Sequence, residues 1–246
     1  MSSVTVVMPA HNEAGGIVEF LTEVRSALGD DLAGFIVVDD VSSDSTRDVL
    51  VALADDGFPV TVVPNETNLG HGPSTLRALR AGLERGTVVV AVDGDGQFLG
   101  EDIADLVRIH EVCDYDVVEG VRTERGDPLF RRLTSAATRT LVARDCGERV
   151  NDANTPLRVY RPEVLRKLLD QLPQQAMTPN LMIASLTRRD GFRYKAIPVR
   201  SIPRRGDTQL GSTWGQKRKA LPTKRFIRFC ADATSEWRAF RSASSR

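Results

Sequence analysis

Two carboxylates stand one residue apart in the segment Asp93-Gly94-Asp95-Gly96-Gln97, directly after a run of β-branched residues. A hard cation such as Mg²⁺ or Mn²⁺ binds one or two carboxylates and completes its octahedron with phosphate oxygens and water. Asp-Gly pairs are also ordinary turn formers, so the segment by itself is ambiguous. Its position after an expected buried strand, level with three other polar strand ends, favours a cation site at Asp93 and Asp95.

Polar residues also follow the three other strands that we expect in the first third of the chain. The segments are residues 9–13 (PAHNE), 39–46 (DDVSSDST) and 68–73 (NLGHGP). The glycines of the third segment allow close approach of the backbone to a ligand. Because ligands of parallel sheets bind at the carboxyl ends of the strands, we expect these segments to surround one ligand.

The elements that must position these segments are read from the hydrophobic pattern. Nearly continuous apolar runs predict buried parallel strands, and the stretches between them have apolar residues at helical spacing. Strands are expected at residues 4–9, 35–40, 60–64, 87–93 and 115–120, and helices at residues 13–28, 45–54, 73–85 and 101–111. Alternating strands and helices predict a doubly wound parallel sheet.

The pattern changes after residue 121, where arginines become frequent. The later elements are a helix at residues 127–143, a strand at 157–160, a helix that begins at Pro162, a helix at 179–189 and a strand at 193–199. Pro162 suits the first position of a helix. Since no linker rich in Gly, Ser and Pro separates the two halves, we expect the second half to extend the same domain.

The composition excludes several classes of protein. The 33 basic and 33 acidic residues of the 246-residue chain cancel, so no overall charge favours nucleic acid as a partner. No apolar run approaches the ~18 residues that span a bilayer. The N-terminus shows neither a basic segment nor a cleavage site of a signal peptide. We therefore expect a cytoplasmic protein.

The C-terminal residues 216–246 carry nine Lys and Arg residues against only Asp232 and Glu236. Aromatic residues recur there at helical spacing, which predicts a basic amphipathic helix. Two interpretations remain open. The aromatic face packs against the protein core, or the helix lies at the inner membrane face, attracted by anionic lipid.

Taken together, these motifs resemble family 2 glycosyltransferases, especially the dolichol- and polyprenol-phosphate sugar synthases, over residues 4 to 212. The resemblance implies an α/β fold of the GT-A type, Rossmann-like, with a mostly parallel central sheet and helices on both faces. It implies that the nucleotide of a UDP- or GDP-sugar contacts Pro9, Ala10, His11, Glu13, Val38, Asp40, Asp93, Gly94 and Asp95. It also implies that Mg²⁺ or Mn²⁺ is held by Asp93, Asp95 and Gln97.

The second half resembles the acceptor-binding part of the same family. The positions that match the family's motifs imply that an acceptor phosphate is held by Arg122, Arg131, Ser135 and Arg205, with Asp152 near the reaction centre. Arginine suits this role because it binds phosphate with two parallel hydrogen bonds and stays charged. Residues 177–181 contain no carboxylate that could serve as a general base. A phosphate acceptor needs none, because it is already ionised at pH 7.

The domain plan follows from this resemblance. Residues 1–121 form a nucleotide-sugar-binding half, residues 122–215 an acceptor-binding half of the same domain, and residues 216–246 the basic helix. The expected reaction is a metal-dependent, inverting transfer to a polyprenyl phosphate. Alternatives are a soluble hydroxyl acceptor, such as a saccharide or natural-product intermediate, and a non-catalytic subunit that binds nucleotide sugars. A dinucleotide oxidoreductase is disfavoured, since Gly15-Gly16 does not fit the Gly-x-Gly-x-x-Gly turn.

Overall fold

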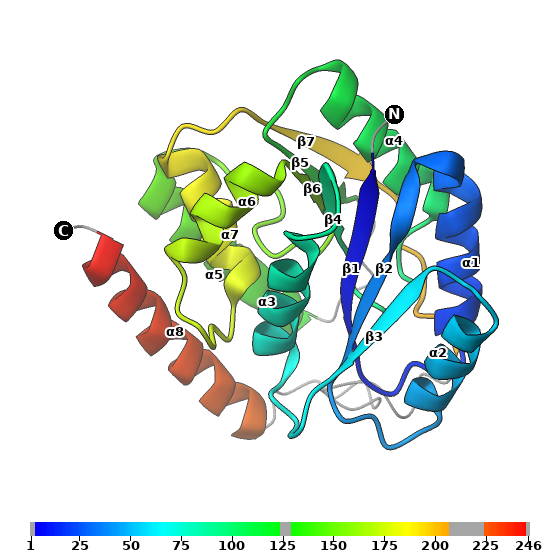
Figure 1. Cartoon of the computed structure of the whole chain (residues 1–246). Helices are drawn as coiled ribbons and strands as arrows, with labels where there is room; N and C mark the ends of the chain where they lie inside the picture. The colour runs from blue at the N-terminus through cyan, green and yellow to red at the C-terminus, as the bar shows by residue number, and fades with distance from the viewer. Residues whose placement is uncertain (1–2, 124–128, 207–223, 245–246) are drawn as a thin grey trace.

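The computed structural model describes residues 3–123, 129–206 and 224–244, without the side chains of residues 129–133, 224–225 and 244 (Figure 1). A central sheet of seven strands has the order β3-β2-β1-β4-β6-β5-β7. The strands are β1 (Val4–Ala10), β2 (Leu32–Asp39), β3 (Val60–Pro64), β4 (Val88–Ala91), β5 (Val117–Arg122), β6 (Arg158–Tyr160) and β7 (Tyr194–Val199).

Helices cover both faces of this sheet (Figure 1). They are α1 (Ile17–Leu28), α2 (Thr46–Asp55), α3 (His71–Gly82), α4 (Gly100–Val112), α5 (Leu129–Cys146), α6 (Pro162–Asp170), α7 (Pro179–Arg189) and α8 (Lys224–Ser244). A single turn of 3₁₀ helix, Gly29–Asp31, follows α1. One apolar cluster lies under α1 and α4, and a second lies under α3, α6 and α7. The mostly parallel α/β fold that the sequence predicts is confirmed.

The first four strands are parallel and create a topological switch point. Strands β3, β2 and β1 pair side by side, and β4 pairs with the other edge of β1. The connections after β1 and β4 therefore leave the sheet in opposite directions. A crevice forms outside the carboxyl ends of such strands, where ligands of this class of fold bind. The topology places residues 9–13 and 93–97 at this point.

Strand β6 differs from the expected parallel pattern. It runs antiparallel to both of its neighbours, β4 and β5. Residues 147–157 carry the chain from α5 back to the carboxyl end of β5, where Gly120 N–H donates to the Leu157 carbonyl (2.9 Å). Because the chain enters β6 from that end, the segment around Asp152 lies at the same edge of the sheet as Arg122.

Helix α1 begins four residues later than the sequence predicts. Residues 13–16 form a turn in which the Glu13 carbonyl accepts hydrogen bonds from Gly16 and Ile17 N–H (both 3.0 Å). Two successive glycines, Gly15 and Gly16, weaken helix formation there. Glu13 is consequently part of the connection after β1, and its side chain is free to face the site instead of a helix surface.

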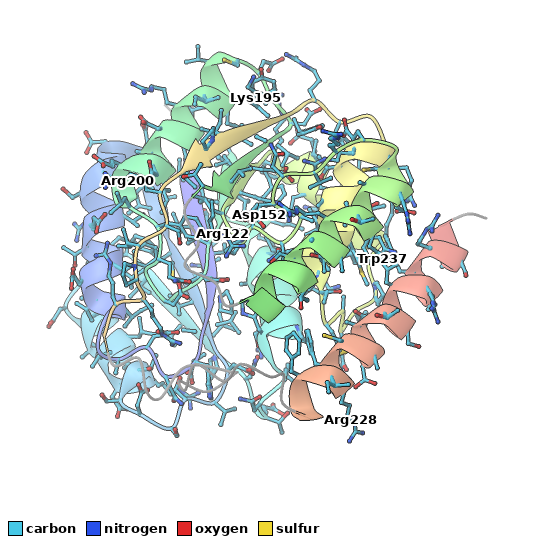
Figure 2. All side chains as sticks on the ribbon, turned by 180° about the vertical axis from the view of Figure 1, so that it is seen from behind. Arg122, Asp152, Lys195, Arg200, Arg228 and Trp237 are labelled. Atoms are coloured by element: carbon cyan, nitrogen blue, oxygen red, sulfur yellow. The ribbon has the colours of Figure 1, made fainter. Side chains whose placement is uncertain are left out.

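The C-terminal helix α8 packs against the core. Trp237 and Phe240 are 2% and 3% exposed, and they join the apolar cluster that includes Leu181 and Met182 of α7. Figure 2 shows Trp237 on the side of α8 that faces the rest of the molecule, and Arg228 at its outer side. Among the described residues, no helix combines the length and apolar character needed to cross a membrane.

A buried group of three charged side chains joins the second half of the chain to the sheet. Glu119 of β5 is 1% exposed and lies between Arg158 of β6 (Nε–Oε1 3.2 Å) and Arg188 of α7 (Nη2–Oε2 2.6 Å). Both arginine side chains are almost fully buried. A carboxylate in such a place is tolerated only because its charge is compensated on two sides.

Replacing this carboxylate should severely destabilise the fold. Glu119→Ala leaves two buried guanidinium groups without their partner, which we expect to lower the free energy of unfolding by about 3–5 kcal/mol. Denaturant unfolding followed by circular dichroism measures the change. The matched control is Asp105→Ala, which removes an exposed pair with Arg108 and should cost less than about 1 kcal/mol. Equal effects of both variants would contradict the role assigned to Glu119.

Candidate functional site

The loops after β1 and β4 contact each other at the switch point. Gly94 N–H donates to the Pro9 carbonyl (3.2 Å). A Cβ atom at Gly94 would lie 2.9 Å from the same carbonyl oxygen, so only glycine fits without a shift of the backbone. This close approach brings the diacid segment that begins at Asp93 alongside Ala10 and the residues that follow it.

Asp93 and Asp95 form an acidic pair with little compensation. Asp93 Oδ1 is buried and accepts no hydrogen bond from any described residue. Burial, and next the charge of Asp93, raise the pKa of Asp95 from 3.8 to about 6. No described lysine or arginine forms an ion pair with either carboxylate. A pair of carboxylates that disfavours its own ionisation in this way gains most from a bound cation.

Glu13 adds a third carboxylate to the same region. Burial raises its pKa from 4.5 to about 7, against the opposing effect of Arg204, and the charges of Asp95 and Asp93 raise it further. Arg204 Nε donates to Glu13 Oε2 (3.0 Å). Three carboxylates that influence one another therefore lie at the switch point, and the described arginine paired with them is Arg204.

The donor set at this point fits a divalent cation that also binds another ligand. No group of three or more His, Cys, Asp or Glu side chains in the described ranges could hold a metal ion on its own. Two carboxylates, one with a buried oxygen that accepts no hydrogen bond from a described residue, match the partial protein coordination usual for Mg²⁺. Gln97 lies two residues on and donates its Nε2 to the Ile202 carbonyl (3.3 Å).

His71 lies beside the diacid segment. It is the first residue of α3, its side chain is half exposed, and its Nε2 is 3.5 Å from Asp93 Oδ1. Our sequence analysis gave His71 no role in the site. A usable signal was present, because His71 stands between two glycines in a polar segment that follows an expected strand.

The carboxylate of Asp40 organises the loop after β3. It accepts hydrogen bonds from Asn65 Nδ2 (2.7 Å), Leu69 N–H (2.8 Å) and Gly70 N–H (2.8 Å), and it is 4% exposed. The first turn of α3 therefore starts at a point fixed by Asp40. Asp40 lies directly after β2, at the carboxyl end of the strand, and its oxygens are already bonded to protein donors.

The connection after β2 is held to the one after β1. His11 Nδ1 lies 2.9 Å from the Asp40 carbonyl, and Asn12 N–H donates to Ser42 Oγ (3.0 Å). Val41 has a φ of 57°, a left-handed conformation that favours glycine and costs a valine of order 1–2 kcal/mol. Val38 differs from these residues, since it is fully buried and its side chain belongs to the core.

Arg122, the last residue of β5, pairs with Asp152 (Figure 2). Arg122 Nε donates to Asp152 Oδ2 (2.8 Å), and Nη2 lies 3.3 Å from Oδ1 and 3.1 Å from the Asn154 carbonyl. Asp152 is 7% exposed, whereas 18% of the Arg122 side chain is exposed. The sequence-based expectation that these residues share one site is compatible with this pairing.

The segment that carries Asp152 is anchored by the buried Arg158. Its Nη2 donates to the Ala153 carbonyl (3.3 Å), and its Nη1 donates to the Asn180 carbonyl at the start of α7 (3.0 Å). Arg158 therefore positions two segments of the second half while it compensates Glu119. Residues 177–181, which contain no carboxylate, include the Asn180 carbonyl that Arg158 binds.

The remaining predicted acceptor residues are not gathered on one anion. Arg205 Nη1 pairs with Glu19 (3.1 Å), its Nη2 pairs with Glu23, and its Nε donates to the Gly96 carbonyl (3.1 Å). The expected convergence of Arg122 and Arg205 on a phosphate is therefore not met in this structure, because each guanidinium already neutralises a carboxylate. Ser135 lies on α5, and the Arg131 side chain lies outside the described residues.

Residues 200–206 cross over the diacid segment. Arg205 N–H donates to the Asp95 carbonyl (3.1 Å), and Ile202 N–H donates to the Gln97 carbonyl (3.0 Å). Arg204 then reaches Glu13, a contact that our sequence analysis missed because it attached the acceptor role to the neighbouring Arg205. Sequence adjacency cannot tell which of two consecutive arginines faces the site.

The chain is similar to known proteins both in sequence and in fold. Curated relatives include the undecaprenyl-phosphate 4-deoxy-4-formamido-L-arabinose transferases of Pseudomonas aeruginosa (strain LESB58) and Serratia proteamaculans (strain 568). They are 34% identical over 171 residues and 31% identical over 186 residues, covering 68% and 74% of this chain. These alignments cover 49% and 56% of the relatives, so the chain spans about half of their length.

Solved structures share the fold at lower identity. Glucosyl-3-phosphoglycerate synthase of Mycobacterium tuberculosis, in complex with Mn²⁺, UDP and phosphoglyceric acid, has a TM-score of 0.66 at 19% identity, over 98% of this chain and 78% of that one. A mannosyltransferase of Pyrobaculum calidifontis in complex with GDP-Man and Mn²⁺ has a TM-score of 0.60 at 20% identity, over 97% and 63%. The sequence model of Glycosyl transferase family 2 matches residues 5–191, and the chain belongs to that family.

Proposed function

We propose that this protein transfers a sugar from a nucleoside diphosphate sugar to a polyprenyl phosphate, with Mg²⁺ or Mn²⁺ at Asp93 and Asp95. The observation that carries the proposal is the acidic pair at the switch point, where a buried oxygen of Asp93 accepts no hydrogen bond from a described residue and has only His71 beside it (3.5 Å) as a described ion-pair partner. Asp93 and Asp95 would hold the cation, which would supply the missing positive charge. In doing so it would stabilise the negative charge on the leaving diphosphate.

The donor would occupy the crevice between the connections that follow β1, β2 and β4. Asp40, with the loop that it fixes, and His11 would contact the base and ribose, and the diacid segment would face the diphosphate. Structural neighbours in complexes with UDP or with GDP-Man and Mn²⁺ support a donor of this class.

Charge and the curated relatives support a polyprenyl phosphate as the acceptor. Those relatives are named as transferases of undecaprenyl phosphate. In the proposed reaction a phosphate oxygen attacks the anomeric carbon as its bond to the diphosphate breaks, and the nucleoside diphosphate leaves with the electron pair. The attacking oxygen is already ionised, so no general base is needed. Arg122, with Arg131 and Ser135, would bind the acceptor phosphate.

A hydroxyl acceptor is the second candidate. The ion pairs of Arg122 with Asp152 and of Arg205 with Glu19 favour it, because both guanidinium groups are already neutralised. A hydroxyl nucleophile requires a base, and Asp152 is the carboxylate that pairs with Arg122. For Arg122 to bind a phosphate, it must exchange at least part of its contact with Asp152 for the ligand.

One assay distinguishes the two acceptors. UDP- and GDP-sugars are incubated with Mn²⁺ or Mg²⁺ and a short polyprenyl phosphate, the matching polyprenol without phosphate, or 3-phosphoglycerate. We expect transfer to the polyprenyl phosphate alone. Transfer to the polyprenol or to 3-phosphoglycerate instead would establish the hydroxyl-acceptor reaction. Donor binding without transfer to any of them, or hydrolysis, would indicate a binding subunit.

Contact of the protein with a membrane surface is part of the proposal, and it would rely on charge. The aromatic residues Trp237 and Phe240 are buried against the core and are unavailable for insertion. Arg228 and Arg238 lie on the exposed side of α8. Each basic side chain near an anionic surface adds about 1 kcal/mol of attraction, which salt screens.

The diacid segment gives the first prediction for the proposed reaction. Asp95→Asn removes one negative charge from the cation site and should lower turnover by at least about 100-fold. Calorimetry with Mn²⁺ and UDP should show a matching loss of cation affinity. The control Asp105→Asn changes an exposed aspartate of α4 and should behave as the unmodified protein. Full turnover by Asp95→Asn in the presence of a chelator would rule out the cation role.

Asp40 gives a prediction for donor binding. Asp40→Ala removes the acceptor of three N–H groups that shape the loop at residues 65–70. Losing one or two hydrogen bonds to the nucleotide, directly or through this loop, should raise the Kd for UDP or GDP about tenfold. Calorimetry measures the affinity, with the exposed Asp55→Ala as the control. An unchanged Kd in a folded variant would exclude Asp40 from nucleotide recognition.

Arg122 gives a prediction for acceptor binding. Arg122→Ala should raise the KM for polyprenyl phosphate at least about tenfold, because a hydrogen bond to a charged group is lost. The donor KM should stay nearly constant. Arg139→Ala is the matched control, since Arg139 is an exposed arginine of α5 that contacts the Asn151 carbonyl only at 3.5 Å. A rise confined to the donor KM would place Arg122 on the nucleotide side.

A further inference from the structure

The C-terminal helix α8 lies outside the segment that matches the family, yet one of its side chains contacts a loop beside the site. Glu236 accepts the Met177 N–H with both carboxylate oxygens, at 2.9 and 3.0 Å. Met177 belongs to the connection between α6 and α7. A backbone N–H bound to a carboxylate is a charge-assisted hydrogen bond, stronger than a bond between neutral groups.

Helix α8 is held firmly enough to position this side chain. The residue after Glu236 is Trp237, which is 2% exposed. Its ring packs against that of Phe240, with 5.7 Å between the two ring centroids. One turn later, Arg241 pairs with Asp145 of α5, and Asp145 also accepts a hydrogen bond from Ser185 of α7. Glu236 is therefore presented from a helix that is fixed to both α5 and α7.

The connection that Glu236 binds has few side-chain hydrogen bonds of its own. Thr178 precedes α7 but makes no capping hydrogen bond, and its buried Oγ1 has no partner among the described residues. Ala176 N–H bonds only locally, to the Pro173 carbonyl (3.2 Å). Arg80 of α3 also donates to the connection, at the Gln174 carbonyl (3.2 Å), and Glu236 is the described side chain that binds it at the Met177 N–H.

The same connection lies directly on the first turn of α3. A Cβ atom at Gly72 would stand 2.4 Å from the carbonyl oxygens of both Ala176 and Met177. On one side of this turn, Gly70 N–H donates to Asp40 Oδ2 (2.8 Å). On the other side, His71 Nε2 lies 3.5 Å from Asp93 Oδ1. The backbone that Glu236 fixes is therefore packed against the turn that lies between Asp40 and the diacid segment.

We propose that Glu236 is a positioning residue. By holding the 176–177 backbone against Gly72, it sets the first turn of α3, and with it His71 and the Gly70 N–H, relative to Asp93 and Asp40. It contacts no substrate. The consequence for function rests on the proposed binding of a nucleoside diphosphate and a cation at these residues. The structural effect of Glu236 on the first turn of α3 does not depend on that proposal.

The test compares Glu236→Ala with Glu236→Gln, which keeps an oxygen that accepts the Met177 N–H, and with Asp232→Ala, an exposed acid one turn earlier on α8. Amide hydrogen exchange of the full chain reads the coupling without any need for activity. We expect Glu236→Ala to speed exchange about tenfold at residues 70–76 as well as at 176–178, and the other two variants to match the unmodified protein. Gly72→Ala should reproduce the loss from the opposite side of the contact.

Binding of UDP with Mn²⁺, measured by calorimetry, then tests the functional consequence. A weaker affinity in Glu236→Ala, restored in Glu236→Gln, is the expected result at equal melting temperatures. Faster exchange confined to 176–178, or spread equally through α5, α7 and α8, would overturn the proposal. Coupled exchange without any binding of UDP by the unmodified protein would leave the positioning intact and contradict the proposed function instead.

Discussion

The buried carboxylate of Glu119, held between Arg158 and Arg188, is the constraint on which the second half of the molecule depends. An ionised group with 1% exposure has to be compensated in full, and the two arginines come from β6 and α7. Arg158 then uses its remaining N–H groups on the Ala153 and Asn180 carbonyls. One charge requirement thereby fixes the short antiparallel strand, the start of α7 and the segment that presents Asp152.

The first half has the opposite balance of charge. Glu13, Asp93 and Asp95 influence one another, and the pKa values of Glu13 and Asp95 are raised because burial is not offset by enough positive charge. Glu119 has two arginines for one carboxylate, whereas this group has Arg204 as its described arginine partner. The fold compensates the buried Glu119 completely. A lack of positive charge around Glu13, Asp93 and Asp95 is therefore expected of a site where a ligand supplies that charge. This difference separates the structural ionic group from the candidate site.

The fold was predictable because its signals are local. Apolar runs and helical periodicity located the strands and helices, and the rule for strand ends brought residues 9–13 and 93–97 together. Three features depend on contacts between distant residues and could not be read from spacing. They are the antiparallel β6, the choice between Arg204 and Arg205, and the salt bridge of Arg122 with Asp152. Val38 illustrates the same limit, since its side chain is buried in the core and the nucleotide contact implied for it, which stays a prediction, would have to come from its backbone.

The sequence pattern of helix α8 allows two interpretations, and the packing of the helix decides between them. Its sequence fits both an aromatic face against the core and a basic face against a membrane. In the structure the aromatic residues Trp237 and Phe240 are buried. Removing either side chain from the core would cost about 3–5 kcal/mol, as truncation of a large buried aromatic usually does. Each basic side chain at an anionic surface contributes only about 1 kcal/mol of attraction. The charged face can therefore act while the helix stays docked, which keeps Glu236 on the Met177 N–H whatever the basic face contacts.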